Sequence, residues 1–104
     1  MEELRTCITR HWIHSHEEDT PNARTYRPAG YDFPPARGRV GFDFQAGGKL
    51  IYYGIAPVDG SEQLPGRWRI DEPNRVRIDV DHERIRPFVL DVISCDGDRL
   101  VVRR

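Results

Sequence analysis

The chain has 104 residues, a formal net charge of −1, and 38% hydrophobic against 32% charged residues. This composition predicts one soluble globular domain over residues 1–104 and argues against a disordered chain. A net charge near zero gives no overall field that would favour nucleic acid or an anionic membrane surface.

The N-terminal residues are acidic, and no apolar run is long enough for a membrane helix, so we expect neither a secretory signal nor a membrane span. These expectations together predict a cytoplasmic protein. Cys7 and Cys95 are then expected to be reduced thiols. A closed barrel would bring the chain ends together, which makes a bridge geometrically possible, but reduced thiols are the favoured interpretation.

Residues 9–16 contain β-branched and aromatic residues and are interpreted as the first strand. If Trp12 faces the core, His14 and His16 share its side and Ile13 points away; the opposite phase is also open. The acidic and polar residues 17–22 predict a loop.

Residues 24–37 combine three aromatic residues with three prolines. Proline pairs poorly inside a sheet, so we do not expect a strand here. Three aromatic side chains in fourteen residues are nevertheless expected to be packed and not left exposed to water. We therefore predict an ordered loop whose rings pack over the sheet or over one end of a barrel.

Two apolar runs, residues 38–45 and 49–56, flank Gly47-Gly48. A two-residue type I′ turn needs positive φ at both central residues, which glycine supplies. This turn would place Phe44 opposite Ile51 and Phe42 opposite Tyr53. The predicted inward face consists of Val40, Phe42, Phe44, Ile51, Tyr53 and Ile55.

After a predicted loop over residues 57–65, alternation predicts strands at 66–71 and 75–81, joined by a three-residue turn. This pairing sets Trp68 opposite Ile78, and it leaves Arg69 opposite Arg77 as a like-charged pair on the outer face. A sixth strand over residues 85–95, with a bulge or edge position at Pro87, and a seventh containing Leu100 and Val102 complete the predicted sheet.

Trp12 after the lead-in, the Phe42/Phe44 strand with its Gly-Gly turn, and Gly66-Arg67-Trp68 followed by alternating hairpins resemble the small bacterial lipocalin-like (calycin-type) domains. The resemblance covers most of the chain, although Arg10 stands where the Gly-x-Trp motif of lipocalins has glycine. It implies an all-β, antiparallel up-and-down meander of about 7–8 strands that forms a small barrel, either closed or partly open. It implies no reaction.

Two groups of residues could bind a small molecule. Arginine forks beside tyrosine rings in residues 24–39 could recognise a carboxylate or phosphate, although the favoured interpretation is that their stems cover the sheet. Large aromatic residues inside the barrel could line a cavity or fill the core, and core is favoured; an inward His14 would favour a pocket. The candidate ligand-binding residues are Tyr26, Arg27, Tyr31, Arg37, Arg39, His14, Tyr53 and Trp68.

Other chemistries find weaker support. His14 and His16 share a strand face near acidic residues, but zinc sites usually take at least three protein ligands, so we predict no metal and no cofactor. The arginines of the later strands alternate with aspartates, which indicates a solvated face and not a nucleic-acid stripe. No nucleophile elbow or phosphate loop argues for an enzyme.

The sequence thus predicts a non-catalytic binding module with a shallow site at the barrel end under residues 24–39. Its ligand would be small and partly apolar or anionic. The alternative is a protein-interaction or self-association domain, such as a homodimer, with a filled barrel core.

Overall fold

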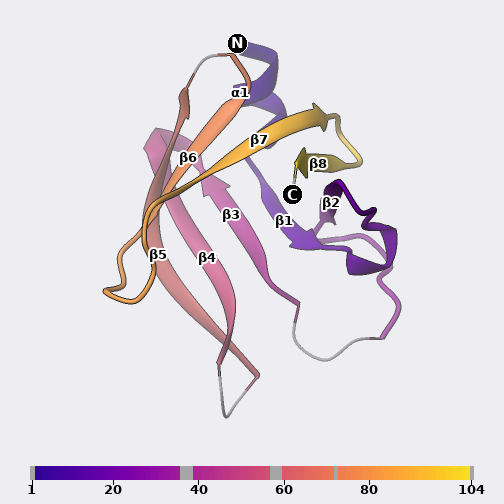
Figure 1. Cartoon of the computed structure of the whole chain (residues 1–104), viewed down its shortest axis with the longest axis horizontal. Coiled ribbons are helices and arrows are strands. Elements are labelled where there is room, and N and C mark those ends of the chain that lie inside the picture. The colour runs from indigo at the N-terminus through magenta and orange to yellow at the C-terminus, as the bar shows by residue number, and fades with distance from the viewer. Residues whose placement is uncertain (1, 36–38, 57–59, 72, 104) are drawn as a thin grey trace.

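The computed structural model describes residues 2–35, 39–56, 60–71 and 73–103, and these residues form one closed antiparallel β-barrel (Figure 1). The all-β fold class and the small barrel are confirmed. In chain order the elements are α1 (Glu2–Ile8), β1 (His11–His14), the 3₁₀ turn η1 (His16–Glu18), β2 (Ala23–Pro28), β3 (Gly41–Gln45), η2 (Ala46–Gly48), β4 (Lys49–Ala56), β5 (Gly60–Asp71), β6 (Arg75–Val80), β7 (Phe88–Cys95) and β8 (Leu100–Arg103).

Strands β3 to β8 follow one another as a meander, and the β1–β2 hairpin closes the barrel. In this closure β1 pairs with β3, and β2 pairs with β8. The chain leaves β2 beside the start of β1 and enters β3 beside its end, because Pro28 pairs with Trp12 and Gly41 with Ile13. The connection between β2 and β3 is described over residues 29–35 and 39–40. Its described ends are hydrogen-bonded to β1, from Ala29 N–H to the His11 carbonyl (3.0 Å) and from His14 N–H to the Val40 carbonyl (2.8 Å).

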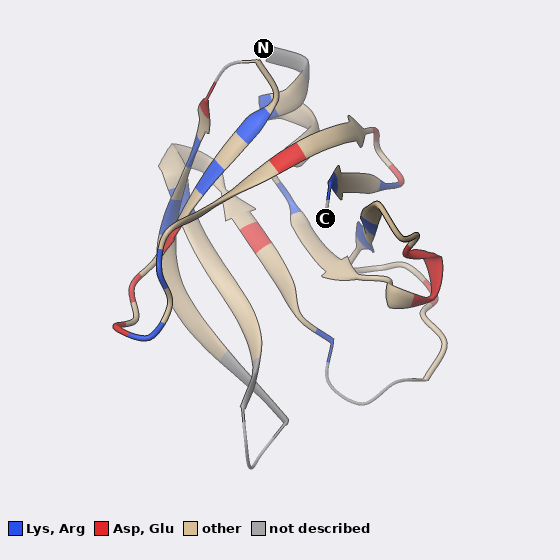
Figure 2. Ribbon diagram, in the orientation of Figure 1, with Lys and Arg blue, Asp and Glu red and all other residues tan. Residues whose placement is uncertain are grey.

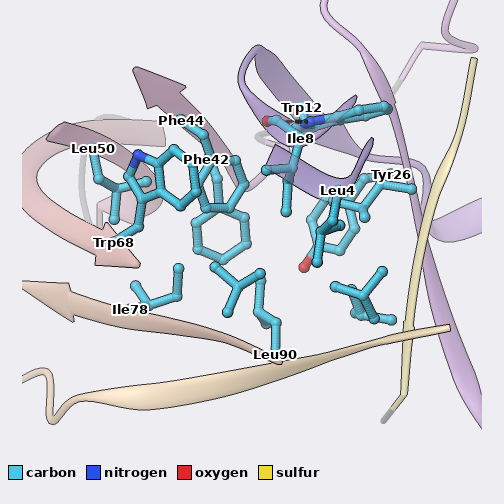
Figure 3. Packing of buried hydrophobic residues seen from close by; sticks show 14 of the residues in the cluster. Leu4, Ile8, Trp12, Tyr26, Phe42, Phe44, Leu50, Trp68, Ile78 and Leu90 are labelled. Carbon is cyan, nitrogen blue, oxygen red and sulfur yellow. Dashed lines mark hydrogen bonds between the residues drawn. The ribbon is translucent and has the colours of Figure 1, made fainter. Parts of the chain in front are cut away.

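Helix α1 lies at the barrel end opposite the long β4–β5 hairpin (Figure 1). Its Leu4 and Ile8 side chains belong to the buried core, and the Trp12 indole N–H donates to the Ile8 carbonyl at 3.0 Å (Figure 3). A disulfide joins Cys7 of α1 to Cys95 of β7. The expectation of two reduced thiols is therefore wrong: closure of the barrel brings the chain ends within bonding distance. Among the described residues, no helix is long and apolar enough to cross a membrane.

The predicted first strand is present but shorter than expected, and the structure decides its phase, which the sequence left open. Trp12 is fully buried, and the His14 ring lies 5.2 Å from the ring of the buried Tyr26, so both residues face inward. The strand ends at His14, because η1 begins at His16. His16 therefore leaves the strand and does not continue its inward face.

Strand β2 lies where an ordered loop was expected. Within its six residues the β-branched Thr25 and the aromatic Tyr26 are buried, and proline occurs only at the last position, Pro28. A terminal proline costs a sheet little, because few ladder hydrogen bonds depend on its nitrogen. The prolines that follow misled the interpretation of the whole stretch, although the loop expectation holds for residues 29–35.

The central hairpin has a different register from the one expected. Its turn has three residues, Ala46–Gly48, in which Gly47 and Gly48 have φ angles of 79° and 81°. Phe44 consequently pairs with Leu50, not Ile51, and Phe42 pairs with Tyr52, not Tyr53. A shift of one residue exchanges the two faces of a strand. Leu50 and Tyr52 thus face inward, whereas Ile51 and Tyr53 lie on the outer side of the barrel wall.

The later strands agree more closely with expectation. Every predicted β5–β6 pair is present, including Trp68 with Ile78 and the like-charged Arg69 with Arg77. Strand β5 begins at Gly60 instead of residue 66, because its first half pairs with the end of β4. Strand β7 begins after Pro87, and its irregularity lies between Val92 and Ser94.

Candidate functional site

The barrel end away from α1 contains a cavity of about 260 Å³. Strands from opposite sides of the barrel contribute to its walls, which places it inside the mouth and not on the outer surface. The lining residues are Arg24, Tyr26, Val40, Phe42, Tyr52, Phe88, Val89, Leu90, Val102 and Arg103. Most of the lining residues are aliphatic or aromatic, and arginine supplies the charge.

Phe42 of β3, which Figure 3 shows among the buried core residues, is the centre of the aromatic wall. Its ring centroid lies 5.7 Å from that of Tyr26, 5.5 Å from that of Tyr52 and 6.2 Å from that of Phe88. These spacings are those of favourable tilted aromatic pairs. The wall depends on the three-residue turn of η2, because that turn brings Tyr52 to the same face as Phe42.

Arg24 and Tyr26 alternate along β2, so their side chains lie on the same face of that strand. Burial raises the pKa of the Tyr26 hydroxyl to about 12, although hydrogen bonding and charge from Arg24 act in the opposite direction. The phenol is therefore protonated at neutral pH and can donate a hydrogen bond. No ion pair joins Arg24 or Arg103 to a carboxylate among the described residues.

Two of the predicted arginines, Arg27 and Arg39, lie outside the barrel and already have partners. Arg27 contacts Glu18 through two nitrogens, at 2.8 and 2.6 Å, and its guanidinium lies 4.7 Å from the Tyr31 ring centroid. Arg39 contacts Glu17 in the same way, at 3.0 and 2.7 Å. Such two-point pairs are the strong form of ion pair.

The two pairs change the ionisation of both acids. The hydrogen bond from Arg27 lowers the pKa of Glu18 to about 2, and the hydrogen bond from Arg39 lowers that of Glu17 to about 2. The arginine side chains are only 14% and 10% exposed. Arg27 therefore holds β2 against η1, and Arg39 holds the residues just before β3 against η1. Both guanidinium groups offer little surface to an anionic ligand.

Three further candidates take separate places. The His14 Nε2 atom lies 2.8 Å from an Asp19 carboxylate oxygen, so this inward histidine has a partner. Tyr53 stacks on His11 at 4.6 Å on the outer face. Trp68 belongs to the core near the α1 end, where its indole N–H donates to the Gln45 carbonyl at 2.9 Å.

The structure thus groups the candidate residues in a new way. Tyr26 lines the cavity and His14 packs behind it, whereas Arg27, Tyr31 and Arg39 form the outer cluster. Arg37 lies outside the described residues. Tyr53 and Trp68 lie away from the cavity.

Sequence reasoning missed Arg24, Tyr52 and Arg103 as cavity residues, and it placed Phe42 and Phe88 only in the apolar face. Alternation of Arg24, Tyr26 and Pro28 was the available signal for β2, but the prolines that follow obscured it. The Tyr52 signal was ambiguous, because four consecutive apolar residues, Leu50 to Tyr53, fit either register.

Groups of three or more potential metal ligands are not found among the described residues. Comparison with known proteins finds no matching family model, curated protein or solved structure.

Proposed function

We propose that the protein binds a small, partly apolar ligand in the open mouth of its barrel and carries out no catalysis, as a lipocalin-like binding module would. The observation that carries this proposal is the aromatic cavity around Phe42. A closed barrel of eight antiparallel strands is compatible with the resemblance to bacterial lipocalin-like domains, and barrels of this size hold at most one small ligand.

The cavity volume of about 260 Å³ limits the size of the ligand. Apolar cavities of about 150 Å³ are large enough for benzene, whereas pockets for drug-sized molecules begin near 300 Å³. A compound with one or two rings, or a short branched chain, is therefore the expected size.

The charge at the cavity favours a ligand with an anionic group. Both charged lining residues, Arg24 and Arg103, are cationic. The Tyr26 phenol, which is protonated at neutral pH as in any tyrosine, adds a hydrogen-bond donor on the same strand face as Arg24. An aromatic carboxylate would combine an apolar body with a group that arginine recognises.

Titration of the protein with benzoate- and naphthoate-sized carboxylates, followed by NMR shifts and calorimetry, tests the proposal. We expect Tyr52→Ala to weaken binding at least about tenfold, because a large aromatic wall is lost. Tyr53→Ala is the matched control, since Tyr53 is the next residue of the same strand but lies on the outer face. Equal affinity in both variants, or shifts confined to the outer face, would refute the site.

A comparison of each carboxylate with its neutral amide tests the role of charge. Arg24→Gln should reduce the preference for the carboxylate while leaving binding of the amide unchanged within about twofold. An equal loss for both ligands would show that Arg24 acts through packing and not through charge.

A second candidate function is self-association. Val89 and Ile93 of β7 are 45% and 52% exposed and would be the apolar contacts of such an interface. Sedimentation equilibrium would then show a mass that rises with concentration and falls in a Val89→Ser/Ile93→Ser variant. A constant monomer mass would exclude this function.

The cytoplasmic location expected from the sequence stays a prediction, and the Cys7–Cys95 bond weighs against it, because such bonds are typical of oxidising compartments. Alkylation of thiols in intact cells before lysis would decide the point. Two blocked thiols would favour the cytoplasm, and two protected cysteines would favour an oxidising location.

A further inference from the structure

A second hollow lies on the outer wall of the barrel, over β5, β6 and the η2 turn. It has a volume of about 360 Å³ and is lined by Gly47, Gly48, Arg67, Trp68, Arg69, Arg77 and Asp79. It shares no lining residue with the cavity in the barrel mouth. Any ligand in this hollow would therefore be independent of the ligand proposed above.

The hollow concentrates positive charge. Arg67, Arg69 and Arg77 contribute three cations against the single carboxylate of Asp79. Strands β5 and β6, which carry these residues, are paired neighbours, and Figure 2 shows cationic positions on both. Lys49 of β4 adds a further cation, because it pairs directly with Arg67.

In this part of the sheet, residues of like charge are directly opposed on neighbouring strands in two places. Lys49 of β4 lies opposite Arg67 of β5, and Arg69 of β5 lies opposite Arg77 of β6. Directly opposed like charges destabilise a sheet. Arg67 also stands opposite Asp79, which offsets part of its repulsion, whereas the residues directly opposite Arg77 are Arg69 and Val89 and include no carboxylate. Arg75, two residues before Arg77 on β6, differs from Arg77 because it has an acidic partner: its side chain contacts Asp91 of β7 at 3.1 Å.

The ion pairs elsewhere in the molecule sharpen this contrast. Arg27 and Arg39 each have a glutamate of their own, and Arg69 contacts Asp71 at 3.3 Å at the edge of the hollow. Among the described residues, no ion pair joins Arg67 or Arg77 to a carboxylate. A bound anion would supply the missing negative charge.

We propose that this hollow binds a phosphate group, held mainly by the guanidinium groups of Arg67 and Arg77. Planar guanidinium forks match the oxygen atoms of phosphate, and a charge near −2 would offset the repulsion between opposed cations. The absence of side chains at Gly47 and Gly48 leaves room beside the phosphate for a small organic group.

The size of the charged area indicates a small ligand and not a nucleic-acid chain. A third hollow adjoins the proposed phosphate site and shares Arg67 and Asp79 with it; Asp81 also lines this third hollow. The carboxylates of Asp79 and Asp81 follow Arg77 closely on the same strand and its end, so the positively charged area is small. Nucleic acid requires a continuous basic surface.

The test is an NMR and calorimetric titration of the full chain with inorganic phosphate and with phenyl phosphate at low ionic strength. Arg77→Gln should weaken phosphate binding at least about tenfold, because it removes one guanidinium fork. Arg75→Gln is the matched control: it removes a cation from the same strand outside the hollow, and it should change affinity less than about twofold.

A measurement without ligand tests the repulsion separately. Arg77→Gln should leave the melting temperature unchanged or raise it, because a like-charged pair is removed. A fall in the melting temperature would contradict that part of the argument. An equal loss of phosphate affinity in both variants would show general charge attraction and overturn the site.

Sedimentation with vesicles that contain phosphatidate distinguishes the two sources of phosphate. Binding of phenyl phosphate in solution, lost in Arg77→Gln, supports a soluble phosphate ester. Binding to vesicles alone, with the same loss, supports a lipid headgroup as the source of the same chemistry. Binding to neither would refute the proposal.

Discussion

Removal of the Cys7–Cys95 bond should destabilise the barrel strongly. The bond joins residues 88 positions apart, so it closes a loop of almost the whole chain. The chain-entropy relation for a loop of about 90 residues gives a stabilisation of roughly 4.6 kcal/mol at 25 °C. Small domains have only about 5–15 kcal/mol of total stability, so the loss would be a large fraction of it. The melting temperature should fall on the order of 15–30 °C.

Urea unfolding followed by tryptophan fluorescence is a suitable assay, because Trp12 and Trp68 are both buried and should shift on exposure. A Cys7→Ser/Cys95→Ser variant should lose stability to the same extent as the reduced wild type. An alanine pair controls for the hydroxyl groups. Unchanged midpoints in all three, or two free thiols in the untreated protein, would refute the reasoning.

Three other predictions follow from particular contacts. Gly41→Ala should cost at least about 2–4 kcal/mol in urea unfolding, because its new methyl group would collide with the Trp12 carbonyl at the β1–β3 seam; Gly30→Ala, with open space around it, should change stability by less than about 0.5 kcal/mol. In the folded protein the pKa of Glu18 is about 2, against an ordinary value of 4.5, so its stabilising effect is present above pH 4.5 and is lost as the pH falls towards 2. Glu18→Gln should therefore reduce the loss of unfolding free energy over this pH range, and an unchanged pH dependence would contradict the pairing. In a rapid alkaline pH jump followed by tyrosine absorbance, Tyr26 should ionise near pH 12, and Tyr26→Phe should remove that step while keeping the earlier ones.

The sequence predicted the β5–β6 hairpin correctly because several signals agreed there. Strict alternation of Val76, Ile78 and Val80 left one possible inward face, and the short turn allowed one register. The inward phase of Trp12 was also among the expectations, since a large apolar residue on a short strand has few other places to pack. Local patterns determine structure well where the two faces of a strand differ clearly.

The same reasoning failed where the two faces look alike. Leu50, Ile51, Tyr52 and Tyr53 are all apolar or aromatic, so alternation could not choose between a two-residue and a three-residue turn. Pairing with Phe42 and Phe44 inside a closed barrel decides the register, and that information is not local. The disulfide was missed for a related reason: closure of the barrel sets the distance between Cys7 and Cys95, whereas the compartment was inferred from composition.

These two failures bear directly on the candidate site. With the expected register, Tyr53 would have faced inward; the observed register places Tyr52 there, beside Phe42 and Phe88. With residues 24–37 as a loop, Arg27 and the flanking Arg39 looked available for an anion. In the structure Arg27 pairs with Glu18 and Arg39 with Glu17. Formation of β2 instead places Arg24 beside the cavity.

The two ends of the barrel differ: one carries helix α1 and the disulfide, and the other contains the cavity. Helix α1, its disulfide and the buried Trp12 lie at one end of the barrel. At the other end, aromatic side chains line the cavity of the mouth. A chain of 104 residues can form only one modest core. Tyr26, Phe42, Leu90 and Val102 belong both to this core and to the lining of the cavity, whereas the Cys7–Cys95 bond lies away from the cavity. Loss of the disulfide should therefore lower stability while leaving the residues that line the cavity unchanged.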